Sequence, residues 1–176
     1  MRRVAAMLLL ASTCALAQQP HHRVMLAVFG HPDDESLSGP VLARYAREGA
    51  KVYLAIATKG EKGTNERARI PAGEPLAKVR RAETECSCRE LGIEALIFLE
   101  ANDGELGAIT DPIGRNVERL ADKLAEVIGN LKPDVVITGG PEGGEHGNGA
   151  IAIVAASPNV PVSFVRPEQR AGLCQR

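Results

Sequence analysis

The chain has 176 residues, which is enough for one domain with a hydrophobic core, and 44% of its residues are hydrophobic. Its formal net charge is -1, which argues against a surface for nucleic acid. Aromatic residues make up only 3%, so platforms on which bases could stack are not expected either. Composition therefore favours a globular protein with no nucleic-acid partner.

Residues 1–17 have the pattern of a secretory signal peptide. Arg2 and Arg3 form a basic start, the apolar run Val4–Leu10 follows, and Ala15–Ala17 contributes small residues at the spacing that a signal peptidase requires. The apolar run is too short to span a bilayer comfortably, and a simple N-terminal anchor is the alternative. We expect a mature chain that starts near Gln18, has no membrane span after signal removal, and is secreted or periplasmic.

Hydrophobic patterning predicts strands that alternate with helices along the rest of the chain. Short apolar runs indicate strands buried on both faces, while proline in a first turn and glycine after a last turn mark helix ends. The predicted strands are Val24–Phe29, Val52–Thr58, Ala95–Leu99 and Val135–Thr138, and the predicted helices are Pro40–Glu48, Pro75–Leu91 and a long helix that opens at Asp111-Pro112 and runs to Leu131. This alternation predicts an α/β fold with a mainly parallel sheet and right-handed crossovers.

In such sheets a ligand binds beyond the carboxyl ends of the strands, so the loops that follow the strands carry most of the functional information. The four loops concerned span residues 30–39, 59–73, 100–107 and 139–149. We expect the site to be built from these loops.

The first of these loops places one imidazole and three carboxylates within five residues, from His31 to Glu35. Such a cluster repels itself unless a cation lies in it, and Zn²⁺ accepts nitrogen and carboxylate oxygen together. If one aspartate binds the metal, its neighbour is free to accept a proton from water. The alternative is that Asp33, Asp34 and Glu35 only cap the following helix.

The segment Val28–Glu35 resembles the signature of the PIG-L/LmbE-like deacetylase family. Further stretches resemble later family motifs, and they occur in the same order and at the expected strand ends. These stretches are Gly73–Glu83 leading into Leu91-Gly92, Asn102-Asp103-Gly104, Pro133–Thr138 and Gly140–Gly144. The resemblance implies a Rossmann-like three-layer sandwich over residues 22–157 and the activity of a zinc-dependent N-deacetylase that acts on acetylated amino sugars.

Roles for individual residues follow from the same resemblance. It implies that His31 and Asp34 are zinc ligands and that Asp33 is the general base for the attacking water, while zinc polarises the acetamide carbonyl. Arg80 and Asp103 would help to hold the sugar or to order the site. The alternatives are that Arg80 pairs on the helix surface with Glu83, three residues on, and that Asp103 is an ordinary turn residue before a glycine.

The fourth loop departs from the family pattern. The family presents two histidines here, one as a metal ligand and one that assists catalysis, whereas this chain has only His146 between Glu145 and Ala150. If His146 is the zinc ligand, the assisting role is empty, and if His146 assists, the ligand position falls on Gly149. Residues 158–176 form a tail unlike the family, so the domain is expected to be incomplete at its C-terminal end.

Two functions follow. The first is a secreted, zinc-dependent amidohydrolase whose substrate is a small N-acetylated amino-sugar conjugate or glycan. The second is a catalytically impaired or inactive relative, because one histidine role is empty. Nucleotide binding is disfavoured, because the His31–Asp34 segment would repel phosphate and no Gly-x-Gly-x-x-Gly motif follows the first strand.

Overall fold

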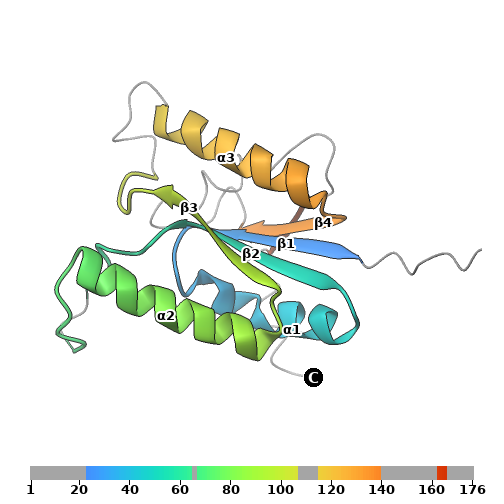
Figure 1. Cartoon of the computed structure of the whole chain (residues 1–176), viewed down its shortest axis with the longest axis horizontal. Helices are drawn as coiled ribbons and strands as arrows, with labels where there is room; N and C mark the ends of the chain where they lie inside the picture. Colours follow the sequence, from blue (N-terminus) through green and yellow to red (C-terminus); the bar gives the residue numbers. More distant parts are fainter. Residues whose placement is uncertain (1–22, 65–66, 107–114, 140–161, 166–176) are drawn as a thin grey trace, which may run out of the picture.

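The computed structural model describes residues 23–64, 67–106, 115–139 and 162–165. These residues form a parallel sheet of five strands in the order β3-β2-β1-β4-β5 (Figure 1). The strands are β1 (Val24–Phe29), β2 (Lys51–Thr58), β3 (Ala95–Ala101), β4 (Val135–Gly139) and β5 (Val162–Val165). The α/β class and the parallel sheet expected from the sequence are confirmed.

The central strands form where the sequence is continuously apolar. Five of the six residues of β1 are buried, and Leu26, Ala27 and Val28 have no exposed surface. Burial on both faces explains why this strand shows no apolar–polar alternation. The predicted bounds of β1 are confirmed, whereas β3 continues two residues past the predicted end at Leu99. A register shift against β2 and a positive φ of 56° at Glu100 accommodate the extension.

Helices α1 (Gly39–Arg47) and α2 (Glu74–Leu91) pack on one face of the sheet. A proline in the first turn opens each helix, and α2 ends at Gly92, whose φ of 72° is the left-handed conformation that glycine adopts readily. Leu42 of α1 and Cys88 of α2 are buried against residues of β1 and β2. Both helices start one residue before the predicted position.

Helix α3 (Arg115–Leu131) covers the opposite face, which completes three layers (Figure 1). Its Leu120 and Leu124 are buried against Leu26, Val28 and Val136 of the sheet. The predicted opening of this helix at Asp111-Pro112 lies outside the described residues, and so do residues 1–17 and His146.

Strand β5 is a difference from the sequence-based expectation, which places residues 158–176 in a tail outside the domain. Val162–Val165 pairs in parallel with β4, with Val136 opposite Val162 and Gly139 opposite Val165. A run of only four residues next to several prolines gives little pattern to detect. This part of the tail therefore continues the sheet.

The strand order fixes where a ligand site should lie. The chain runs outward from β1 through β2 to β3, and then crosses to β4 on the other side of β1. The carboxyl ends of β1 and β4 therefore flank the topological switch point, where open parallel sheets leave a crevice. The loop that follows β1 begins at this point.

The structure also bears on membrane association. Within residues 23–64, 67–106, 115–139 and 162–165, no helix combines the length and the apolar character needed to cross a bilayer.

The two cysteines of α2 differ in environment, and this gives a first prediction. Cys86 is exposed and Cys88 is 5% exposed. Burial, reinforced by the charges of Glu35 and Glu85, raises the pKa of the Cys88 thiol to about 11. At pH 8 only about a thousandth of Cys88 would be thiolate, the form that reacts. We expect iodoacetamide to label Cys86 in the folded protein and Cys88 only after unfolding, as measured by peptide mass mapping. Equal labelling of both in folded protein would contradict this packing.

Candidate active site

The turn after β1 is held by its own carboxylates. The backbone N–H of His31 donates to Asp34 Oδ2 at 2.9 Å, and that of Asp33 donates to Glu35 Oε2 at 2.9 Å. Asp33 has a φ of 98°, a left-handed conformation that is costly for residues other than glycine. The alternative was that the acidic residues only cap the following helix, but neither the short 3-10 helix after Asp33 nor α1 has a side-chain hydrogen bond at its N-cap, and the carboxylates hold the turn itself. Glu35 is 4% exposed and serves the turn rather than the cleft.

A cleft with a volume of about 540 Å³ opens in front of this turn. Such a volume is typical of sites for small molecules. The cleft is lined by His31, Asp33, Asp34, Lys62, Gly63, Thr64, Arg80, Asp103 and Gly104. The loops that follow β1, β2 and β3 thus meet at one edge of the sheet, as the sequence predicted.

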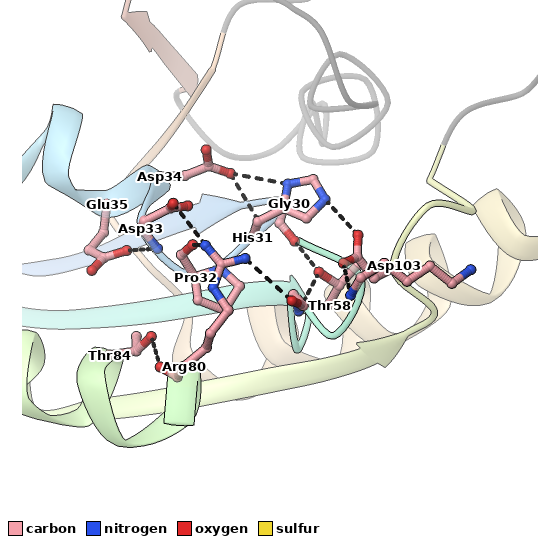
Figure 2. Close-up of polar contacts among 12 residues, drawn as sticks. Gly30, His31, Pro32, Asp33, Asp34, Glu35, Thr58, Arg80, Thr84 and Asp103 are labelled. Carbon is pink, nitrogen blue, oxygen red and sulfur yellow. Dashed lines mark hydrogen bonds and ion pairs between the residues drawn. The ribbon is translucent and has the colours of Figure 1, made fainter. Parts of the chain in front are cut away.

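His31 lies between two carboxylates (Figure 2). Its Nε2 is 3.3 Å from Asp103 Oδ1, and its Nδ1 is 3.7 Å from Asp34 Oδ2. The neighbouring Asp34 carboxylate raises the pKa of the His31 imidazole; partial burial opposes this, and the charges of Asp103 and Asp33 add to it. The surroundings thus favour a positive charge at this point, supplied by a proton or by a bound cation.

Asp103 is fixed from several sides. Its Oδ2 accepts the backbone N–H of Lys62 at 2.7 Å, and its own N–H donates to Glu61 Oε1 at 2.9 Å. Its other carboxylate oxygen, Oδ1, faces His31, so each oxygen of Asp103 contacts a polar partner. Asp103 is 7% exposed, so it is more than a surface turn residue.

Arg80 reaches from α2 to the turn and does not depend on Glu83. Its Nη2 donates to Asp33 Oδ2 at 2.8 Å and to the carbonyl of Pro32 at 3.0 Å, and its Nη1 donates to the carbonyl of Gly60 at 3.3 Å. The alternative of a helix-surface pair is therefore wrong. Arg80 orders the turn that carries Asp33, as the dashed contacts in Figure 2 show.

The surroundings of Asp33 raise the pKa of its carboxyl group, although they contain opposing influences. Desolvation in the turn raises the pKa of the Asp33 carboxyl, Arg80 lowers it, and the charges of Asp34 and Glu35 raise it further. The Asp33 side chain is 70% exposed, so solvent screens these effects. Asp33 thus presents an accessible carboxylate to the cleft.

Two donors in the cleft suit a zinc ion. In tetrahedral zinc sites, bonds of about 2.0–2.1 Å place neighbouring ligand atoms about 3.3–3.4 Å apart. His31 Nδ1 and Asp34 Oδ2, at 3.7 Å, come close to this spacing. Among the described residues no group of three or more His, Cys, Asp or Glu side chains is arranged to hold a metal ion. The predicted third ligand, His146, lies outside them.

Several cleft residues were not singled out from the sequence. Lys62, Gly63 and Thr64 line the cleft, and Thr58 joins two loops because its Oγ1 donates to Gly30 O and accepts the N–H of Gly60. The only signal for them was the polar, glycine-rich loop directly after a buried strand. That pattern identifies a loop, but it does not specify which side chains face a ligand.

These features define a class: a parallel α/β protein with an imidazole–carboxylate cleft at the switch point of its sheet. The family model described as GlcNAc-PI de-N-acetylase matches residues 26–157. The chain therefore belongs to the PIG-L family, as its motifs predicted.

Known relatives agree with this family. A 1D-myo-inositol 2-acetamido-2-deoxy-alpha-D-glucopyranoside deacetylase of Streptomyces griseus is 37% identical over 140 residues, covering 69% of this chain and 43% of the relative. The chain thus spans less than half the length of that relative. A probable N-acetyl-alpha-D-glucosaminyl L-malate deacetylase of Bacillus cereus is 32% identical, with 70% and 54% covered.

Solved structures share the fold. The N,N'-diacetylchitobiose deacetylase of Pyrococcus horikoshii superposes with a TM-score of 0.64 at 24% identity, covering 77% of this chain and 48% of that one. At this identity the likeness establishes the fold alone.

Proposed function

We propose that this chain is a zinc-dependent N-deacetylase that hydrolyses the acetamide of an N-acetylated amino-sugar conjugate or glycan. The observation that carries the proposal is one cleft in which His31 Nδ1 faces Asp34 Oδ2 beside the accessible carboxylate of Asp33. Family membership and the names of the two relatives, both of which describe deacetylases of glucosamine conjugates, support the choice of substrate class.

His31 and Asp34 would hold the zinc ion, and His146 is the candidate for a further ligand or for the assisting residue. Bound zinc would supply a Lewis acid that polarises the acetamide carbonyl and lowers the pKa of water. Asp33 accepts the proton of the attacking water, and this proton can then pass to the departing amine. Acetate and a free amino sugar result.

The proposal is tested by incubating the protein with N-acetylglucosaminyl-inositol and with N-acetylglucosaminyl-malate and measuring acetate and free amine. Equal amounts of the two products are expected from at least one conjugate. Removal of a group other than acetyl, or no reaction with one equivalent of zinc added, would contradict the proposal.

Asp103 is proposed to orient His31. A carboxylate that accepts Nε2–H leaves Nδ1 as the lone-pair nitrogen, which is the one that faces Asp34. We expect Asp103→Ala to weaken zinc affinity by about 10- to 100-fold. Competition with a chelating dye measures this affinity, and Asn102→Ala, a change at the exposed neighbour, is the control. If Asp103 instead held only the sugar, the variant would show a raised KM and unchanged zinc affinity.

The second candidate function, a catalytically impaired relative, rests on the loop after β4, where His146 stands alone. A deacetylase should lose at least ~100-fold in rate in His146→Ala, because the residue serves as ligand or as assisting group. An impaired relative would show little acetate release in the parent chain and a gain in Gly149→His. Assays of the parent and both variants with added zinc separate the two candidates.

A further inference from the structure

The guanidinium of Arg80 lies in a cradle formed by two glycines of the loop after β2. A Cβ at Gly60 or at Gly63 would each lie 2.6 Å from Arg80 Nη1, closer than real Cβ contacts allow. Gly60 has a positive φ of 66°, so the backbone itself favours glycine there. The φ of Gly63 is not in the positive range. Glycine is favoured at this position because a side chain would occupy the space of the Arg80 guanidinium.

The cradle lets Arg80 connect three segments that are distant in the sequence. Arg80 donates to the Gly60 carbonyl on one side and to the Pro32 carbonyl and the Asp33 carboxylate on the other. The Arg80 side chain is only 17% exposed, whereas that of Asp33 is 70% exposed. The arginine is thus the less exposed partner, held by two further hydrogen bonds to backbone carbonyls, and it restricts an otherwise exposed carboxylate.

We propose that Gly60 and Gly63 are positioning residues, which seat Arg80 so that it aims the Asp33 carboxylate at the reacting atoms. The proposal rests on the proposed deacetylase function for the role of Asp33. In this proposal the glycine-rich loop holds the Arg80 guanidinium in place. Arg80 is then a positioning residue and does not contact the sugar.

Gly63→Ala is the clearest single test. The atom that the new methyl group meets is the far end of a flexible side chain, so Arg80 can swing away at little cost to folding. The Arg80 guanidinium would then lose its hydrogen bond to the Asp33 carboxylate. We expect kcat to fall by about 10- to 100-fold, because a misplacement of about 1 Å can cost that much. KM should stay within about twofold and zinc stoichiometry should not change.

The control is Gly129→Ala in α3, where an added Cβ meets nothing within 4 Å. It should leave kcat and KM unchanged. The decisive comparison repeats Gly63→Ala in a protein that already carries Arg80→Ala. Without the guanidinium, the methyl group at position 63 has nothing to displace. In that background Gly63→Ala should change kcat by less than about twofold, a non-additivity expected only if the two residues act through each other.

A readout that needs no activity keeps the cradle separate from the deacetylase proposal. Thermal unfolding of Asp33→Ala, Arg80→Ala and the double variant should show that the two side chains are coupled, and Gly63→Ala should remove this coupling. If the parent released no acetate yet the coupling behaved in this way, the deacetylase proposal would fall and the cradle would stand. Unchanged kcat in Gly63→Ala, a raised KM alone, or persistent coupling would overturn the cradle.

Discussion

Asp34→Ala is expected to abolish tight zinc binding. Its Oδ2 faces His31 Nδ1, and its loss leaves His31 as the only one of the two proposed zinc ligands among the described residues. In the parent, zinc at 100 times its Kd should add about 2.7 kcal/mol to the free energy of unfolding, because zinc binds only the folded chain. We expect this increment to vanish in Asp34→Ala, together with zinc stoichiometry and acetate release.

The same carboxylate also accepts the N–H of His31, so Asp34→Ala loosens the turn as well. Asp34→Asn keeps an amide oxygen for that hydrogen bond and serves as the matched variant. Glu48→Ala, which removes an exposed carboxylate directly after α1, controls for the change in charge. One zinc ion per chain in Asp34→Ala would contradict the ligand assignment.

Asp33→Asn is expected to keep zinc and lose turnover. The amide cannot accept a proton from water, and a positioned general base contributes about 10²- to 10⁴-fold. We expect kcat to fall by this factor while zinc stoichiometry remains at the parent value. The variant retains the shape of the side chain, so the turn and Arg80 should remain in place.

Metal analysis and acetate release on the same preparation check this result. Turnover at the parent rate would show that Asp33 is not the base. If Asp33→Asn lost both its zinc and its turnover, the roles of the two neighbouring aspartates would have to be exchanged.

The sequence predicted the α/β fold and the part of the site that follows β1. Continuously apolar runs such as Val24–Phe29 are easy to recognise, because a strand that is buried on both faces has apolar residues at successive positions. The His31–Glu35 cluster was also visible, since its residues are adjacent in the chain. A parallel sheet places this cluster beyond the carboxyl end of its strand, as expected, whereas the switch point beside β1 follows only from the strand order in the structure.

Contacts between distant segments could not be predicted in this way. Arg80 meets Asp33 across 47 positions, and Asp103 meets Lys62 across 41, so no local pattern encodes either pair. The family resemblance flagged Arg80 and Asp103 but left open whether they hold a sugar or order the site. The need for glycine at position 63 arises only when the Arg80 side chain is placed beside it.

The central claim is that this cleft uses zinc to hydrolyse an N-acetylated amino sugar. The most direct measurement is acetate release from an N-acetylglucosaminyl conjugate by protein stripped with a chelator, before and after one equivalent of zinc is returned. Our account predicts no release without zinc and restored release with it, in the parent but not in Asp34→Ala. Release that persists in the stripped protein, or that zinc restores equally in Asp34→Ala, would contradict the account.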